Sequence, residues 1–230
     1  MIIYGRNAVH EAIRGPRTVS QVWATNGAGR EPWLAQSGVR VTHEPPDEIA
    51  RRAGSEGHQG VCAEVSEFHY VEGADLLAHD QALIVALDQV QDPQNLGAIC
   101  RSAECAGAAG VVLPERRAAE VTPAVCKASA GAVEHLPLAQ VRNLTDFLND
   151  AKTRGFWCYG ADGEAKLDYR RVDFKGPVVL VMGSEGRGLR PRVASACDAL
   201  ISLPLRGQIE SLSVGAAAAV LLYAAAAARD

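Results

Sequence analysis

The chain has 230 residues, enough to bury a sizeable core in one large domain or in two smaller ones. A formal net charge of −4 and a sequence pI of about 5.9 argue against a protein that holds nucleic acid by bulk positive charge, although a local basic patch is compatible with them. Six scattered cysteines, with neither a C-x-x-C pair nor a cysteine and histidine cluster at zinc spacing, predict a cytoplasmic protein without a metal site.

Residues 1–68 are predicted to form a small α/β domain. Its expected elements, in chain order, are a helix at 7–14, a strand at 19–24, a helix at 31–36, a strand at 39–42, a helix at 46–53 and a strand at 58–65. Glycine followed by proline at Gly15 and Pro16 ends the first helix. Residues 69–80 lose this periodicity and are predicted to be a linker.

From residue 81 to residue 230, strands and helices alternate more strictly. The expected strands lie at 82–88, 110–114, 156–162, 178–182 and 200–203, and the expected helices at 92–108, 122–130, 143–154 and 211–229. This alternation predicts a second α/β domain with a mainly parallel sheet. The last helix is so rich in alanine that we expect it to pack closely against the core or another subunit. Its apolar run at 214–228 is too short for a membrane span, so no membrane attachment is expected.

Three segments after expected strands combine glycine with polar residues. They run from Asn95 to Arg101, across 183–188, and from 204–207 to 211–214. Each alone has a structural explanation, since Asn95 is a good helix N-cap and glycine is the usual residue in tight turns. Arg101 is less easily explained, because a charge on a helix of Ala, Ile and Cys needs a partner or a ligand. Loops beyond the carboxyl ends of parallel strands are where open α/β sheets bind ligands.

No glycine signature of a dinucleotide-binding, phosphate-loop or serine hydrolase enzyme is present. The chain does contain, in this order, N-x-G-x-x-x-R from Asn95, V-M-G-x-E-G-x-G from Val181 and I-x-L-P-x-x-G-x-x-x-S-L from Ile201. These resemble the three motifs of the SpoU/TrmH branch of the SPOUT RNA ribose 2′-O-methyltransferases. Residues 4–9 and 58–60 resemble the substrate-binding domain of the 23S rRNA guanosine members of that branch.

The resemblance covers nearly the whole chain and implies both a fold and a function. It implies an RNA substrate, most simply a guanosine of 23S rRNA, S-adenosylmethionine as cofactor, and a homodimer. It also implies a domain like ribosomal protein L30e at 1–68 and a SPOUT α/β domain with a deep trefoil knot at 81–230. The rival functions are methylation of tRNA, methylation of rRNA by an antibiotic-resistance relative, and RNA binding without turnover.

Site residues follow from the same resemblance, position by position. The implied cofactor-binding residues are Gly183, Ile201, Leu203, Gly207 and Leu212. The residues that the resemblance implies at or around the catalytic centre are Asn95, Arg101, Glu185, Ser211 and Ser213. Ser213 departs from the family pattern, which usually has Asn there, and Ser has a shorter reach.

The role of Arg101 and the role of three later arginines each have two possible interpretations. Arg101 either takes the proton of the ribose 2′-hydroxyl or, because arginine is normally protonated, holds a phosphate beside the target ribose. Arg187, Arg190 and Arg192 are candidates for RNA backbone contacts, with a solvated helix start as the alternative.

Overall fold

The computed structural model describes residues 1–79 and 81–229. The chain divides into two compact units, Met1–His69 with Glu120–His135, and Tyr70–Ala119 with Leu136–Asp230. The grouping of Glu120–His135 with the amino-terminal residues is not evident from the order of the elements. Asp80, at the end of the expected linker, and Asp230, at the end of the expected second domain, lie outside the described residues.

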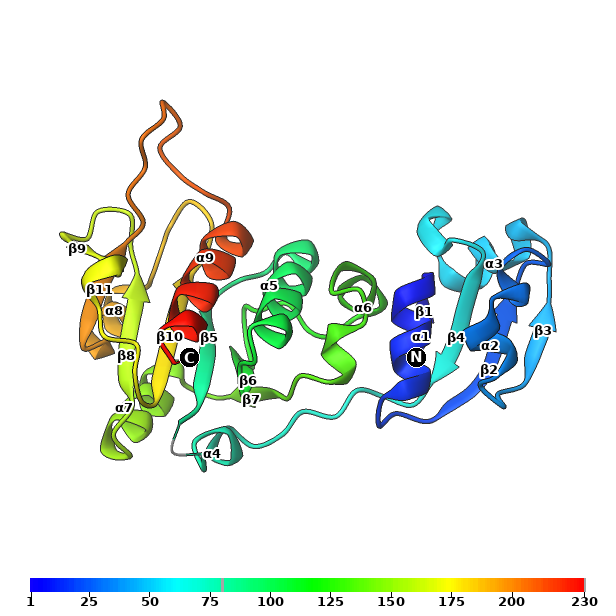
Figure 1. The fold of residues 1–230 in the computed structure, drawn as a ribbon, viewed down its shortest axis with the longest axis horizontal. Helices are drawn as coiled ribbons and strands as arrows, with labels where there is room; N and C mark the ends of the chain where they lie inside the picture. Colours follow the sequence, from blue (N-terminus) through cyan, green and yellow to red (C-terminus); the bar gives the residue numbers. More distant parts are fainter. Residues whose placement is uncertain (80, 230) are drawn as a thin grey trace. The chain divides into compact units, whose positions relative to one another are not determined.

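The first unit contains a four-stranded sheet in the order β1-β4-β2-β3 (Figure 1). Its strands are β1 (Ile2–Tyr4), β2 (Val19–Ala24), β3 (Val41–His43) and β4 (Val61–Val65). β4 pairs antiparallel with β1 and β2, and β3 pairs parallel with β2. The helices of this unit are α1 (Arg6–Arg14), α2 (Pro32–Ala35), α3 (Pro46–Ala53) and α6 (Pro123–Ala128), and its 3-10 turns are η1 (Ala28–Arg30), η2 (Glu56–His58) and η3 (Ala132–Glu134).

The strand expected at 58–65 is shorter than predicted. β4 begins only at Val61, because Gln59 and Gly60 have φ angles of 54° and 81°, which are incompatible with an extended strand. His58 belongs to η2 instead, and its Nδ1 accepts a hydrogen bond of 2.9 Å from the Gly60 N–H. His58 therefore has a local role in this turn.

A buried ion pair explains why Glu120–His135 belongs to the first unit. The Arg17 Nε donates to Glu134 Oε2 at 2.8 Å, and the Arg17 Nη2 donates to Glu134 Oε1. The two side chains are 5% and 0% exposed. Removing two charges from water is costly unless they are well paired, and this fork of two hydrogen bonds satisfies both groups. Burial opposes the charged form of Arg17, but Glu134 outweighs it and the pKa of Arg17 is raised.

The second unit contains a seven-stranded parallel sheet in the order β7-β6-β5-β10-β8-β11-β9. Its strands are β5 (Leu83–Asp88), β6 (Gly110–Pro114), β7 (Leu138–Val141), β8 (Trp157–Ala161), β9 (Leu167–Asp168), β10 (Val178–Gly183) and β11 (Ala199–Ser202). The helices are α4 (Gly73–Leu76), α5 (Pro93–Cys105), α7 (Leu144–Thr153), α8 (Pro191–Ala196) and α9 (Val214–Ala227), with a 3-10 turn η4 (Tyr169–Arg171).

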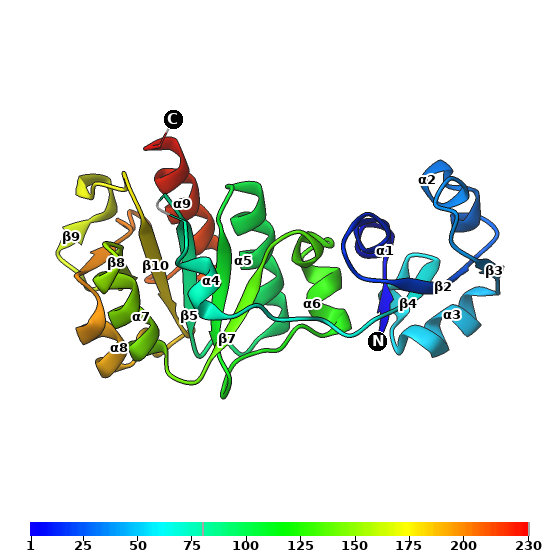
Figure 2. The same ribbon diagram turned by 90° about the horizontal axis from the view of Figure 1, so that it is seen from below.

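Helices cover both faces of this sheet, as the alternation of strands and helices predicts. Figure 2 shows α5 and α9 on one face and α7 and α8 on the other. β5 and β10 lie side by side at the centre, and every residue of both strands is buried. The expected mainly parallel α/β domain is therefore confirmed.

Two details refine the expected elements of this unit. The segment expected to be a linker contains α4, and Val71 forms a parallel bridge with Ala139. α9 begins at Val214, not at Ser211, because Ser213 caps the helix. None of the helices in residues 1–79 and 81–229 combines the length and the apolar character that crossing a membrane requires.

Candidate cofactor and active site

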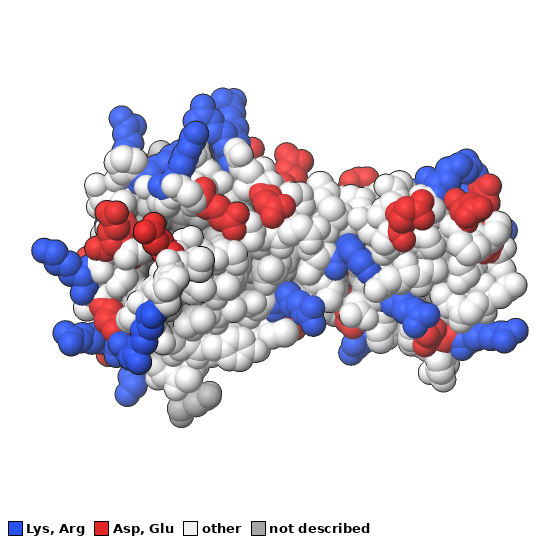
Figure 3. Space-filling view, turned by 90° about the horizontal axis from the view of Figure 1, so that it is seen from above, with Lys and Arg blue, Asp and Glu red and all other residues white. Residues whose placement is uncertain are grey.

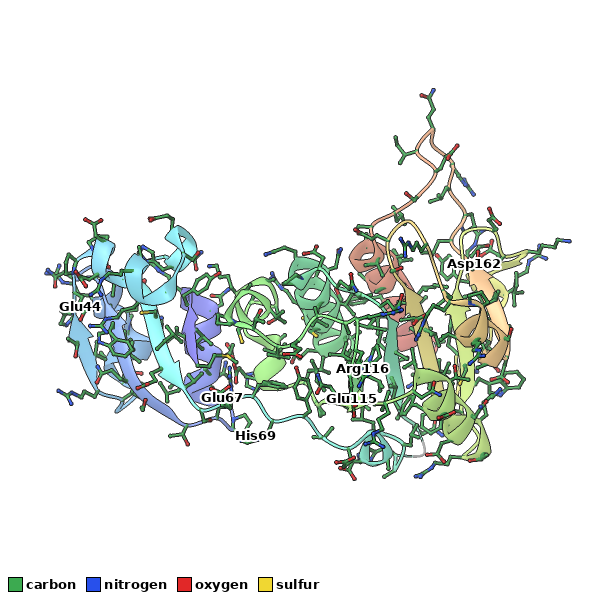
Figure 4. All side chains as sticks on the ribbon, turned by 180° about the vertical axis from the view of Figure 1, so that it is seen from behind. Glu44, Glu67, His69, Glu115, Arg116 and Asp162 are labelled. Carbon is green, nitrogen blue, oxygen red and sulfur yellow. The ribbon has the colours of Figure 1, made fainter. Side chains whose placement is uncertain are left out.

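A cavity of about 210 Å³ lies beyond the carboxyl ends of β8, β10 and β11. Three loops enclose it: the residues after β8, including Asp162, the turn after β10, and the segment between β11 and α9. Asp162, which follows β8, can be located in Figure 4. The cavity therefore occupies the position in a parallel sheet where ligands bind.

The turn after β10 needs glycine for two different reasons. A Cβ on Gly183 would lie only 2.2 Å from the carbonyl carbon of Gly188, so any side chain there would force the turn apart. Gly186 and Gly188 have φ angles of 76° and 63°, which favour glycine. Ser184 and Gly188 exchange two backbone hydrogen bonds of 3.1 and 3.0 Å, which hold the turn folded back on itself. Backbone atoms therefore form this wall of the cavity.

The other walls suit S-adenosylmethionine. Ile201, Leu203 and Leu212 present apolar surface, which suits an adenine ring. Asp162, Glu185 and Glu210 line the same cavity, and carboxylates favour the positive sulfonium and ammonium groups of this cofactor. The apolar side chains, the carboxylates and the tight glycine turn thus fit the cofactor that the motifs imply.

The structure brings together most of the predicted cofactor residues and some of the predicted catalytic ones. Gly183, Ile201, Leu203 and Leu212 line the cavity, and so do Glu185 and Ser211. Gly207, Asn95, Arg101 and Ser213 are not among the lining residues. Within residues 1–79 and 81–229, no three or more His, Cys, Asp or Glu side chains are grouped as metal ligands.

Asn95 is not the N-cap of its helix. That position belongs to Asp92, whose Oδ1 accepts a 3.1 Å hydrogen bond from the Gln94 N–H, and Pro93 follows it in the first turn. Asn95 lies in the first turn of α5 and faces the start of α9, where its Oδ1 is 3.7 Å from the position of a Cβ on Gly215. Capping therefore does not explain Asn95.

Arg101 is exposed on α5. Among the residues that the structure describes, no carboxylate forms an ion pair with its guanidinium. The sequence predicted that Arg101 needs a partner or a ligand. No carboxylate in the described chain is that partner, so the guanidinium N–H groups of Arg101 are free to bind a ligand.

Ser213 has a structural role that accounts for a hydroxyl at this position. Its Oγ accepts a 3.3 Å hydrogen bond from the Ala216 N–H and caps α9. The side chain is exposed, and the cavity is lined by its neighbours Leu212 and Val214. An Asn side chain could provide the same cap.

The pair of Asp88 and Arg190, which supports the turn beside the cavity, was not predicted from the sequence. Asp88 ends β5 and is fully buried, and its Oδ1 accepts from Arg190 Nε at 2.7 Å while its Oδ2 accepts from the Arg190 backbone N–H at 2.7 Å. Asp88 is also the β-sheet partner of Gly183. A carboxylate that ends an otherwise apolar strand was the available signal for this contact.

Comparison with known proteins places both parts of the chain. Residues 82–223 match the model of the SpoU rRNA Methylase family, and residues 2–71 match that of RNA 2′-O ribose methyltransferase substrate binding. A relative in Bacillus subtilis, named as the TrmH family tRNA/rRNA methyltransferase YacO, is 37% identical over 96% of this chain and 93% of its own length.

Solved structures agree with this placement. The AdoMet-bound rRNA methyltransferase of Sinorhizobium meliloti is 28% identical, with a TM-score of 0.78 over 97% of this chain and 85% of its own. The SpoU methyltransferase AviRb of Streptomyces viridochromogenes, in complex with AdoMet, shares the fold at 24% identity, with a TM-score of 0.82 over 99% of this chain and 89% of its own. The chain therefore belongs to the SpoU rRNA methylase family and is an RNA 2′-O ribose methyltransferase that uses S-adenosylmethionine.

Proposed function

We propose that the substrate is a guanosine of 23S rRNA and that its ribose 2′-hydroxyl is the methyl acceptor. The observation that carries this proposal is the likeness of almost the whole chain to an rRNA methyltransferase, at 97% coverage. The match of residues 2–71 to a substrate-binding model supports an amino-terminal RNA-binding domain at 1–68, followed by a linker at 69–80 and a catalytic domain at 81–230. A tRNA substrate is the second candidate, because the Bacillus subtilis relative is named for both RNA classes.

The chain's part in the chemistry is mainly alignment. S-adenosylmethionine, when bound, supplies an electrophilic methyl group on a sulfonium. Glu185 and Ser211, which line the cavity, would hold the ribose, while backbone groups of Gly183, Leu203 and Leu212 would hold the cofactor. Correct placement of the 2′-hydroxyl against the methyl group can supply several powers of ten in rate.

Arg101 in this proposal binds a phosphate beside the target ribose. Arginine stays protonated at physiological pH, so it serves better as a charge that stabilises the developing alkoxide than as a base. Arg101→Lys keeps the charge but loses the planar fork, and we expect it to lower methyl transfer markedly. Full activity of this variant would contradict both roles of Arg101, the phosphate contact and the base.

The active form is, in this proposal, a homodimer. Val220 and Tyr223, three residues apart on α9, are 41% and 55% exposed, so two large apolar side chains lie on the same exposed face of this helix. Light scattering after gel filtration should give twice the monomer mass of 24.3 kDa. Tyr223→Glu should shift the protein towards the monomer, because it would place a charge in the contact.

The substrate is best tested in cells. Ribose methylation should be mapped across all rRNA and tRNA in a strain without this chain and in the same strain with it restored. We expect one methylated guanosine of 23S rRNA to disappear and return. Loss of a methyl group from tRNA alone would assign the second candidate.

A further inference from the structure

Two further cavities lie along the same edge of the parallel sheet. The larger, of about 940 Å³, is bordered by residues that follow β5, β6 and β7, and the smaller, of about 540 Å³, by residues that follow β5, β6 and β10. The two share Gln89 and Arg117, and the smaller shares Ser184 and Glu185 with the cofactor cavity. The three cavities thus form a continuous row that ends at the cofactor cavity.

Arginine dominates the larger cavity, here called the arginine groove. Its lining arginines are Arg116, Arg117, Arg142, Arg190 and Arg192, and among the residues that the structure describes its one lining carboxylate is Asp146. The carboxyl end of β8 points towards the top of Figure 1. Figure 3 views the protein from above, and Lys and Arg side chains gather on this side of the second unit. Arg116 is labelled in Figure 4. This concentration of positive charge contrasts with the net charge of −4 of the whole chain.

Most of these arginines have no acidic partner. Arg190 binds Asp88, but across residues 1–79 and 81–229 no carboxylate oxygen lies within 4.0 Å of a guanidinium nitrogen of Arg116, Arg117, Arg142 or Arg192. All four are exposed. Like charges that share one cavity repel each other unless an anion lies between them, so the groove is electrostatically complementary to a polyanion.

The backbone fixes where Arg117 stands. Gln89 and Arg117 have φ angles of 63° and 60°, which are uncommon for residues other than glycine. The Ala119 N–H donates to the Val90 carbonyl at 2.9 Å, and the Gln91 Nε2 donates to the Arg117 carbonyl at 3.4 Å. These bonds tie the loops after β5 and β6 together, so Arg117 is held at the wall that the two cavities share.

We propose that the arginine groove binds the phosphodiester backbone of the substrate RNA on one side of the target nucleotide, and so selects the ribose that reaches the cofactor cavity. This inference rests on the proposed function and adds Arg116, Arg117 and Arg142 as contacts. Guanidinium groups match phosphate oxygens in charge and in planar hydrogen-bond geometry. The row of cavities gives the RNA strand a path from the groove, past Arg117 and Arg187, to Glu185.

The test compares two triple variants of the full chain. Arg116→Gln, Arg117→Gln and Arg142→Gln together remove three charges from the groove. Arg154→Gln, Arg171→Gln and Lys175→Gln remove three charges from exposed positions of the same unit that line none of the three cavities. Binding of unmodified 23S rRNA transcript is measured over a range of salt concentrations, and binding of S-adenosylmethionine is measured in parallel.

The groove variant should bind the transcript at least about tenfold more weakly. The slope of its log affinity against log salt concentration should be less steep by up to about 2, because each lost phosphate contact removes about 0.7. The control variant should resemble the wild type in both respects, and all three proteins should bind S-adenosylmethionine equally. Equal RNA affinity and salt dependence in wild type and groove variant would overturn the inference, as would an equal loss in the control. RNA binding that depends on the groove in a wild-type protein that methylates no RNA would support the groove and contradict the proposed function.

Discussion

Arg190 binds the fully buried carboxylate of Asp88 twice, through its side-chain Nε and through its backbone N–H, each at 2.7 Å. Asp88 ends β5 and pairs with Gly183, where the glycine turn begins, while Arg190 follows that turn and immediately precedes α8. The pair therefore ties both ends of the 184–190 segment to the centre of the sheet. Backbone groups that line the cofactor cavity are held in place by this contact.

Loss of the Arg190 side chain should destabilise the chain. In Arg190→Ala, Asp88 stays buried with one of its two partners, and we expect the free energy of unfolding to fall by about 1–3 kcal/mol, less than for a fully buried pair because Arg190 is half-exposed. Urea denaturation measures this change. The matched control is Arg192→Ala, which breaks no ion pair within residues 1–79 and 81–229 and should cost under about 0.5 kcal/mol. Equal losses in both variants would argue against a structural role for the Asp88 contact.

The glycine turn should tolerate no side chain at Gly183. Gly183→Ala places a methyl group against the Gly188 carbonyl and should abolish measurable S-adenosylmethionine binding in a calorimetric titration, while circular dichroism still shows a folded chain. Gly163→Ala is the control, because Gly163 lines the same cavity but its Cβ would meet no atom within 4 Å. Undiminished binding by Gly183→Ala would mean that this turn does not form the cofactor site.

The buried pair of Arg17 and Glu134 should be costly to break from one side. Glu134→Gln leaves Arg17 buried without its counter-charge and should lower the free energy of unfolding by about 3–5 kcal/mol. The double variant Arg17→Met with Glu134→Leu removes both charges and should lose less than the sum of the Arg17→Met and Glu134→Leu single variants. Losses that simply add in the double variant would show that the two residues do not stabilise each other.

The thiols should differ strongly in reactivity with Ellman's reagent. Burial raises the pKa of Cys62 and Cys126 to about 11 and that of Cys158 and Cys197 to about 12, whereas Cys105 is exposed. Cys105 should therefore react fastest in the native protein at pH 8, and a Cys105→Ser variant should lose the fast phase.

The pH dependence of that fast phase follows from the thiolate. Burial, with a hydrogen bond that the thiol donates to the Glu104 carboxylate, raises the pKa of Cys105, so the thiol is protonated below that pKa and its rate should rise about tenfold per pH unit. The increase should continue beyond pH 9, the ordinary value for cysteine. A plateau below pH 9 would contradict the raised pKa.

Sequence patterns predicted those parts of the fold that depend on local residues. The run at 178–182 is apolar throughout and the run at 82–88 is apolar up to Asp88, because β5 and β10 are buried on both faces, and both strands were located within one residue. β1, β7 and β9 have three, four and two residues, too short to show a clear period, and were missed. The trefoil knot implied by the motifs stays a prediction.

Contacts between residues distant in the chain could not be predicted from local patterns. Arg17 and Glu134 are 117 residues apart and Asp88 and Arg190 are 102 apart, and neither pair follows a sequence period. In the site, the motifs located the cavity walls through Gly183, Leu203 and Leu212. The arginine groove combines loops after three strands, so it required the order of the strands in the sheet.

Transfer of a methyl group to a ribose of 23S rRNA is tested most directly with the purified protein. The purified chain is incubated with S-adenosylmethionine and unmodified 23S rRNA or tRNA transcripts, and the RNA is digested to nucleosides and analysed by mass spectrometry. We predict 2′-O-methylguanosine in 23S rRNA, at one position, and its absence when Gly183→Ala replaces the wild type. Methylation of tRNA alone, or of neither RNA, by a chain that binds S-adenosylmethionine would contradict this function.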